Sequence, residues 1–302
     1  MAATSLTNLL VEEATAGLDH AQRALLSPFV ELQQRPVLVL GNHKAGTSAV
    51  AGLLGALTGQ PVALELCKEL KRDRYRAVHE GRVPFTKLIA RNKVDFSRPI
   101  IKENHFSTMP DLVMAQFPQS PVIMVTREPR DNIRSLLNRL HIPGDRKHIP
   151  ADAWRSVPHV WKLALDGRWL GLTYDTYIEQ LALRWNLIVE HYLSNRERWV
   201  LQRYEDFQAD KLGQLTDLAK AVGMTPTCDI SDKLNHPFQP PGDRSVTWVT
   251  FFGEENLAII ERICGPRMTQ LGYRLDRVLG GVDPVPIPIE AAKGGDGQTA
   301  SD

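Results

Sequence analysis

The chain has 302 residues, 43% of them hydrophobic and 24% charged, a composition typical of a globular protein that is long enough for one large α/β domain. Its formal net charge of +1 gives no reason to expect nucleic acid or an anionic membrane as an obligatory partner. The three cysteines, Cys67, Cys228 and Cys264, lack metal-ligand spacing, which favours thiols in a reducing compartment and predicts no metal site.

The two ends of the chain differ from its middle. Residues 1–34 place apolar residues at helical spacing, which predicts an N-terminal helical segment. This segment has no continuous apolar core of a signal peptide, and no apolar run anywhere reaches the ~18 uncharged residues of a membrane span. We therefore expect a cytoplasmic protein with no integral membrane segment. Residues 280–302 are rich in Pro, Gly, Ala and Asp, which predicts a disordered tail.

The most informative stretch, residues 37–57, combines a short apolar strand, a loop bounded by Gly41 and Gly46, and an apolar helical run. Such a unit binds anions, because successive backbone N–H groups point into the loop and the helix adds its positive dipole end. The two glycines permit the loop conformation and the close approach of a phosphate. The alternative is an ordinary glycine-containing turn in an α/β domain.

The loop differs from a Walker A loop in the position of its lysine. Walker A reads Gly-x4-Gly-Lys-[Ser/Thr], whereas here Gly46 is followed by Thr47 and Ser48, and the lysine is Lys44, inside the loop. Lys44 supplies a movable charge, and the two hydroxyls can donate to a phosphate. An NTPase would therefore lack its usual phosphate-binding lysine.

Three further apolar segments predict strands that end in polar residues, where ligands bind in open α/β sheets. These are Arg98–Lys102, followed by Glu103, Asn104 and His105; Pro121–Thr126, followed by Arg127; and Trp199–Tyr204, followed by Glu205 and Asp206. Helical patterns cover residues 68–76, 110–117, 132–140, 211–222 and 254–270. We predict one α/β domain over residues 35–279, with a central parallel sheet flanked by helices, in the P-loop nucleotide-kinase-like class.

Residues 141–198 hold four of the six tryptophans. The aromatic and aliphatic residues between Tyr177 and Tyr192 have helical spacing, which favours a core helix. Trp154, Trp161 and Trp169 lie in sequence interrupted by Pro and Gly, and are candidates for an acceptor pocket or its lid. We therefore expect residues 141–198 to form an aromatic-rich helical region that binds the acceptor.

Three segments, in order, resemble the sulfotransferases that use 3′-phosphoadenosine 5′-phosphosulfate (PAPS). GNHKAGTS resembles their 5′-phosphosulfate loop, VTREPRDNIRSLL their 3′-phosphate segment, and RYEDF their Tyr-Glu-Asp strand end. The resemblance covers residues 37–273 and includes the spacing of eight between Arg127 and Ser135. It implies PAPS as co-substrate without a metal ion.

The resemblance also implies roles for particular residues. Those implied to hold the nucleotide are Lys44, Ala45, Gly46, Thr47 and Ser48 at the 5′-phosphosulfate, Arg127 and Ser135 at the 3′-phosphate, Tyr204 near the adenine, and Arg244 in a late basic loop. From the residues alone, an arginine and a hydroxyl beside the loop suit a nucleotide with a second phosphate group at a separate position, whereas ATP carries its phosphates in a single chain. For Tyr204, a tyrosine that merely ends a buried strand is the alternative.

The expected reaction moves SO3 from PAPS to a hydroxyl, or less favourably an amine, by in-line displacement. We expect Lys44 to stabilise the leaving oxygens with help from Lys102, and His105 to take the acceptor proton. Lys102 and His105 are three apart where the arylsulfotransferase branch has lysine and histidine two apart. Glu103 is therefore kept as the competing base, since other branches of the family use a carboxylate.

The sequence leaves other properties of the protein open. A small molecule, a glycan or a lipid would each suit as acceptor, and a homo-oligomer is neither indicated nor excluded. Two other functions stay open: a P-loop small-molecule kinase, which needs magnesium, and a nucleotide-binding relative without catalysis.

Overall fold

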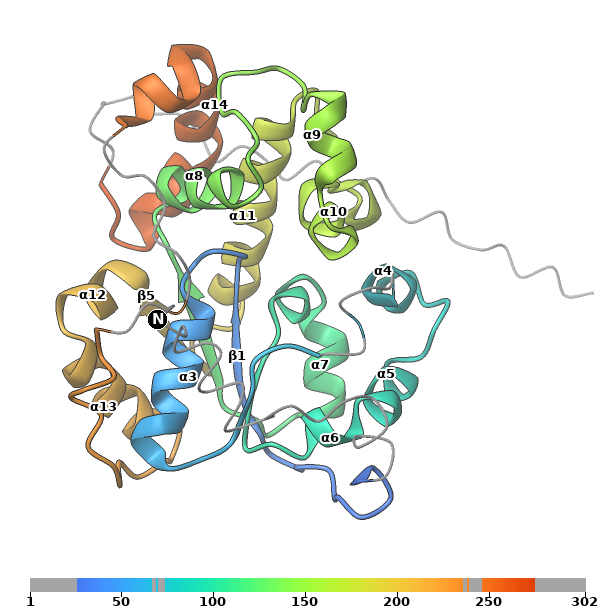
Figure 1. The fold of residues 1–302 in the computed structure, drawn as a ribbon, viewed down its shortest axis with the longest axis vertical. Helices are drawn as coiled ribbons and strands as arrows, with labels where there is room; N and C mark the ends of the chain where they lie inside the picture. The colour runs from blue at the N-terminus through green and yellow to red at the C-terminus, as the bar shows by residue number, and fades with distance from the viewer. Residues whose placement is uncertain (1–25, 67–68, 70–73, 236–237, 239–245, 275–302) are drawn as a thin grey trace, which may run out of the picture.

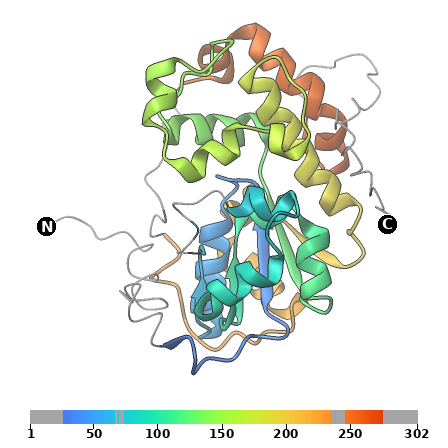
Figure 2. The ribbon, with the colours of Figure 1, turned by 90° about the vertical axis from the view of Figure 1, so that its right-hand side faces the viewer.

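The structure is a computed structural model, which describes residues 26–66, 69, 74–235, 238 and 246–274 (Figure 1). Most of the predicted N-terminal helical segment, the predicted tail, Cys67 and Arg244 lie outside these residues. A central sheet with helices on both sides forms one half of the molecule, and a layer of helices forms the other (Figures 1 and 2).

The sheet has five parallel strands in the order β2-β3-β1-β4-β5. The strands are β1 (Val37–Gly41), β2 (Val62–Ala63), β3 (Ile100–Lys102), β4 (Val122–Thr126) and β5 (Trp199–Arg203). The predicted α/β domain with a parallel sheet is therefore confirmed. The two-residue β2 was not predicted, because so short a strand leaves no periodic pattern.

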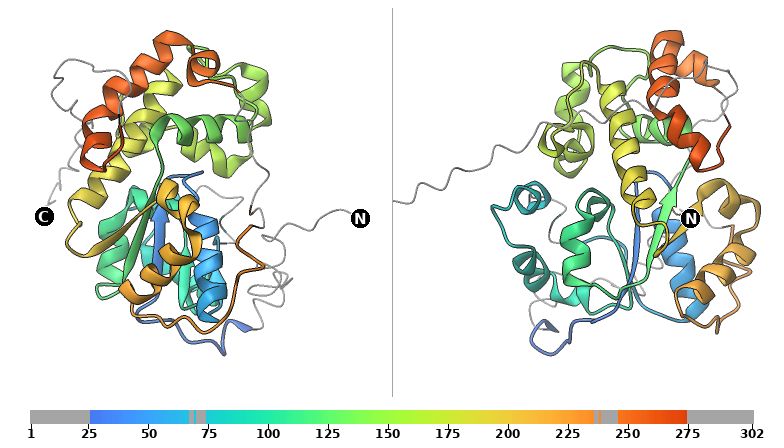
Figure 3. Two further views of the ribbon diagram at one scale, coloured as in Figure 1. Left: turned by 90° about the vertical axis from the view of Figure 1, so that its left-hand side faces the viewer. Right: turned by 180° about the vertical axis from the view of Figure 1, so that it is seen from behind.

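Helices cover both faces of the sheet and the edge where its strands end (Figure 3). The helices of the sheet half are α3 (Thr47–Thr58), α4 (Arg74–His79), α5 (Phe85–Arg91), α6 (Lys93–Phe96), α7 (Pro110–Gln116), α12 (Tyr204–Ala209) and α13 (Lys211–Ala221). The helical layer contains α8 (Pro129–Arg139), α9 (Ala151–Ser156), α10 (His159–Leu165), α11 (Tyr177–Leu193) and α14 (Trp248–Gln270). Two 3-10 helices, η1 (Asn104–Thr108) and η2 (Arg168–Leu170), complete the fold.

The strands are apolar throughout because each of their faces has its own core. Val37 and Val39 belong to the core beneath α3 and α13, whereas Leu38 and Leu40 belong to the larger core that includes α11. The predicted core helix is α11, in which Trp185 is fully buried. None of the helices in the described ranges is long and apolar enough to cross a bilayer.

Two helices begin earlier than the sequence pattern predicts. Helix α8 begins at Pro129 rather than Asn132, because Glu128 caps it by accepting a hydrogen bond from the Asp131 N–H (2.9 Å). Helix α14 begins at Trp248 and is kinked at Gly253 (φ 71°), so the regular pattern starts only at residue 254.

Gly41 at the end of β1 should be intolerant of substitution. Its φ is 151°, and an added Cβ would lie 2.3 Å from the carbonyl oxygen of Val125 in β4. We expect Gly41→Ala to lower the free energy of unfolding by about 2–4 kcal/mol, from backbone strain and the clash together, in urea titrations. Gly223→Ala is the matched control, because its φ of 75° imposes strain but no atom lies within 4 Å. Its expected cost is about 1 kcal/mol, and equal losses in the two variants would show that the clash with Val125 contributes nothing.

Candidate functional site

The loop between β1 and α3 is built to receive an anion. Gly46 is the N-cap residue of α3 with φ 98°, and no side chain caps the helix. The backbone N–H groups of Gly46, Thr47 and Ser48 have no hydrogen-bond acceptor within the described part of the chain. Lys44 adopts the left-handed conformation (φ 67°), which is uncommon for non-glycine residues and is enriched at functional sites. Consecutive unpaired N–H groups at a helix start form an anion-binding concavity.

Lys44 lies in a positive electrostatic environment. Burial, followed by the charges of Arg139, Arg127 and Lys102, lowers the pKa of Lys44 to about 8. Four cationic side chains therefore act on a common region around the loop. A bound anion would relieve their mutual repulsion and restore the pKa of the lysine.

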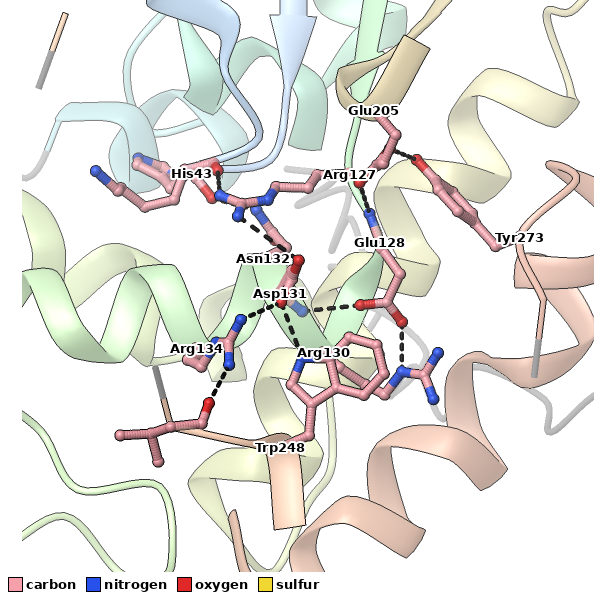
Figure 4. Close-up of polar contacts among 12 residues, drawn as sticks. His43, Arg127, Glu128, Arg130, Asp131, Asn132, Arg134, Glu205, Trp248 and Tyr273 are labelled. Atoms are coloured by element: carbon pink, nitrogen blue, oxygen red, sulfur yellow. Dashed lines mark hydrogen bonds and ion pairs between the residues drawn. The ribbon is translucent and has the colours of Figure 1, made fainter. Parts of the chain in front are cut away.

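Arg127 follows β4 and lies against this loop (Figure 4). It is buried, its Nη1 donates to the Lys44 carbonyl oxygen (3.3 Å), and its Nη2 lies 3.8 Å from an Asp131 carboxylate oxygen. Its Nε is buried with no hydrogen-bond partner. Arg127 thus retains donor capacity for a second anion beside the loop.

Tyr204 packs directly on the loop. A Cβ on Gly46 would lie 2.3 Å from a Tyr204 ring carbon, so only glycine allows this contact. The same ring lies 4.8 Å from the guanidinium of Arg127. Tyr204 is the first residue of α12 rather than the last of β5, and it lies with Arg127 and the loop at one site.

Helix α8 is tied to both the loop and α14 (Figure 4). Asn132 donates to the His43 carbonyl oxygen (2.9 Å), and Asp131 accepts from Arg134 (2.6 Å) and Trp248 (2.8 Å). Ser135 is half-buried in the same helix, one turn after Asp131. These contacts fix the segment that follows Arg127.

Three of the four predicted catalytic residues, Lys102, Glu103 and His105, lie where β3 ends, and the fourth, Lys44, lies in the loop after β1. The ammonium of Lys102 is buried and ion-paired with Glu65. The strand stops at Lys102 and η1 begins at Asn104, so the alternation of a strand does not set the directions of the following side chains. Asn104 accepts a hydrogen bond from Thr47 (3.0 Å), which joins this segment to the start of α3.

Glu103 uses its carboxylate to hold neighbouring groups. It accepts hydrogen bonds from the hydroxyl of Tyr75 (2.7 Å), the N–H of Leu66 (3.2 Å) and the N–H of His105 (3.1 Å). Burial, together with the nearby carboxylate of Glu65, raises the pKa of Glu103 to about 7.

His105 has the properties of a neutral, preoriented imidazole. It is 1% exposed, its ring stacks on Tyr75 at 4.2 Å, and neither ring nitrogen has a hydrogen-bond partner. Burial, and then the charges of Arg184 and Lys102, lower the pKa of His105 well below its ordinary value. A neutral imidazole with a free nitrogen can accept a proton.

The structure adds residues that the sequence patterns did not indicate. His43 lies edge-on to His105 (4.9 Å between ring centroids) and beside Trp161 (5.3 Å). Trp169 is 6.5 Å from His105, whereas Trp154 lies by Lys162 instead. Arg184 is a fully buried charge in the middle of helix α11, and an arginine among the apolar residues of that helix was a signal available in the sequence.

Comparisons with known proteins identify the fold. No family model and no curated protein matches the sequence significantly. Among solved structures, sulfotransferase STF9 from Mycobacterium avium is 14% identical, with 90% of this chain and 88% of that one covered and a TM-score of 0.52. This chain has the sulfotransferase fold. Two further sulfotransferase-fold matches are STF1 from Mycobacterium tuberculosis and a retinol dehydratase solved with androsterone and the inactive cofactor PAP. STF1 is 15% identical, with 85% of this chain and 82% of that one covered and a TM-score of 0.46. The dehydratase is 14% identical, with 85% of this chain and 87% of that one covered and a TM-score of 0.44.

Proposed function

We propose that the protein is a PAPS-dependent sulfotransferase that transfers a sulfuryl group to an acceptor hydroxyl. The observation that carries the proposal is the pairing of two anion sites at adjacent strand ends. One is the loop with unpaired N–H groups before α3, and the other is the buried Arg127, whose Nε has no partner. PAPS carries phosphate groups at both its 5′ and 3′ positions, so it can occupy both sites, whereas ATP has a single phosphate chain.

The proposed donor contacts follow from this arrangement. The 5′-phosphosulfate is bound by the loop residues Lys44, Ala45, Gly46, Thr47 and Ser48. The backbone N–H groups of residues 46–48, the hydroxyls of Thr47 and Ser48, and the ammonium of Lys44 donate to it. Arg127 and Ser135 hold the 3′-phosphate, and Tyr204 lies by the adenine. We assign Arg244, which lies outside the described residues, to the late basic loop that contacts the nucleotide. No metal ion takes part in these contacts.

In the proposed reaction, the acceptor oxygen forms a bond to sulfur while the bond from sulfur to the phosphate oxygen breaks. The charge that grows on the leaving phosphate is stabilised by Lys44 and by the positive potential of Lys102. The acceptor proton goes to His105, whose ring nitrogens are unpartnered. We assign Glu103 a positioning role, because it binds both the N–H of His105 and the Tyr75 hydroxyl beneath the imidazole.

The acceptor side of the proposed site is aromatic. Tyr75, Trp161 and Trp169 surround the two histidines, which favours a ring-containing small molecule over an extended glycan or lipid chain. The described cysteines, Cys228 and Cys264, are free thiols, which suits a reducing compartment such as the cytoplasm.

Nucleotide binding tests the two-anion site. We expect 3′-phosphoadenosine 5′-phosphate (PAP) to bind without magnesium, more tightly than ATP with magnesium, in titration calorimetry. Arg127→Ala should weaken PAP binding by roughly 10- to 100-fold, the value of a charged hydrogen bond. The matched control is Arg198→Ala, an exposed arginine bonded to Pro118, which should leave the affinity unchanged. Preference for ATP with magnesium, unaffected by Arg127→Ala, would indicate a kinase instead.

The identity of the base can be tested by measuring the rate at which the labelled sulfuryl group of PAPS is transferred to a phenol such as 2-naphthol. His105→Ala should lower the rate by about 10²- to 10⁴-fold with PAP affinity retained, and Glu103→Gln should lower it less. Because the pKa of His105 lies well below its ordinary value, protonation of His105 should not limit the rate between pH 6 and pH 7.5, and the rate of Glu103→Gln should be flat there.

The pH profile also separates the competing base. If Glu103 took the proton, the rate would rise several-fold as the pH passes about 7, where that carboxyl ionises. Such a rise, together with a loss of rate in Glu103→Gln larger than that in His105→Ala, would contradict the assignment of His105. PAP binding without transfer to any phenol would favour the non-catalytic alternative.

A further inference from the structure

Arg184 carries a buried charge without a counterion. It lies in α11 and is 1% exposed, and both of its terminal nitrogens, Nη1 and Nη2, lack a hydrogen-bond partner. Its Nε makes a long contact of 3.4 Å to the side-chain oxygen of Asn42. No carboxylate forms an ion pair with it within the part of the chain that the structure describes. Arg130, by contrast, is paired with Glu128 (2.5 Å) and Glu261 (3.0 Å).

An unpaired buried guanidinium destabilises a folded protein, so its presence needs an explanation in function. Burial lowers the pKa of Arg184 to about 10, which still leaves the group charged at neutral pH. The fork of Nη1 and Nη2 is therefore a pair of charged donors without an acceptor. Such a fork matches the two oxygens of a carboxylate.

The unpartnered atoms of Arg184 belong to a larger cluster. His43 Nδ1 and both ring nitrogens of His105 are also buried without partners. The two ring centroids are 4.9 Å apart, and burial lowers the pKa of each histidine, with the charge of Arg184 lowering it further. Aromatic rings of Trp161 and Tyr75 flank the pair. The cluster thus combines a cation, neutral imidazoles and aromatic surfaces.

The cluster lies on the side of the proposed acceptor rather than the donor. Arg184 acts electrostatically on His43 and His105 but not on Lys44, whereas Arg139 and Arg127 act on Lys44, and Lys102 acts on all three groups. Among the described residues, the hydrogen bond from Arg184 to the loop goes to Asn42 at the start of the loop, and none goes to Lys44 or to residues 46–48. The loop and Arg127 already supply the charges that the two phosphate groups of the donor require.

We propose that Arg184, with His43 beside it, binds a carboxylate of the acceptor, so that the substrates are hydroxylated aromatic carboxylic acids. This inference rests on the proposed function and names the substrate class of that same site. The carboxylate pairs with the Arg184 fork, the aromatic ring lies among Trp161 and Tyr75, and the hydroxyl faces His105. Arg184 is then a specificity-determining residue.

The test uses the full chain saturated with PAP and two probes of nearly the same shape, 4-hydroxyphenylacetate and 4-hydroxyphenylacetamide, in which an uncharged amide replaces the carboxylate. Calorimetry should show that the wild-type protein binds the carboxylate at least about tenfold more tightly than the amide. Arg184→Met should abolish this preference while the PAP affinity stays within about twofold. Arg168→Met is the matched control, because Arg168 is exposed in the same aromatic region, and the preference should persist.

Several results would overturn the proposal. These are equal binding of the two probes by the wild-type protein, preference for the amide, or no binding of either probe at millimolar concentration. A loss of PAP affinity in Arg184→Met alone would place Arg184 at the donor and also overturn it. A wild-type protein that does not bind PAP would instead contradict the proposed function, so the two failures are distinguishable.

The thermal unfolding of the ligand-free protein gives an independent readout. If the function of Arg184 is to bind a ligand, Arg184→Met should leave the unfolding midpoint unchanged or raise it, because the substitution removes an unpaired buried charge. Arg130→Met, which breaks two ion pairs, should lower the midpoint. A drop in Arg184→Met as large as that in Arg130→Met would identify Arg184 as a structural charge and overturn the proposal.

Discussion

The close approach of β1 and β4 at Gly41 is the constraint on which the site depends. Gly41 pairs with Val125, and the carbonyl oxygen of Val125 occupies the space that any side chain at Gly41 would need. This contact fixes the start of the anion loop against the strand that ends just before Arg127. Ser107, in η1 just after β3, joins the end of β3 to the same point. Its hydroxyl accepts from the Gly41 N–H (2.7 Å) and donates to the Gly41 carbonyl oxygen (3.1 Å).

Positive charge is concentrated where these strand ends meet. Lys44, Lys102, Arg127 and Arg184 are all partly or fully buried there. Lys102 is paired closely with Glu65, whereas Arg184 has no carboxylate partner among the residues that the structure describes. Such a cluster is unfavourable in the empty protein and favours anionic ligands when they arrive. In the proposed complex the donor phosphates meet Lys44 and Arg127, and the acceptor carboxylate meets Arg184.

The fold was predictable from the sequence, whereas the surroundings of the candidate site were not. Strand β1, the loop and the polar ends of β3 and β4 are local patterns, and they are present as expected. Tyr75 and Glu103 are hydrogen-bonded although they are 28 residues apart in the sequence, and Arg184 and Asn42 are in contact although they are 142 residues apart. No local sequence pattern reveals either contact. The kink at Gly253 likewise hid the first turn of α14. The residue roles within the site stay predictions.

A crystal structure of the protein with PAP tests the central claim most directly. We predict that its 5′-phosphate accepts hydrogen bonds from the N–H groups of residues 46–48, and that its 3′-phosphate is bound by Arg127. The Tyr204 ring, which packs on Gly46, should then lie next to the adenine. A PAP molecule bound elsewhere, or one whose 3′-phosphate points into solvent with Arg127 unengaged, would contradict the two-anion site and with it the proposed sulfuryl transfer.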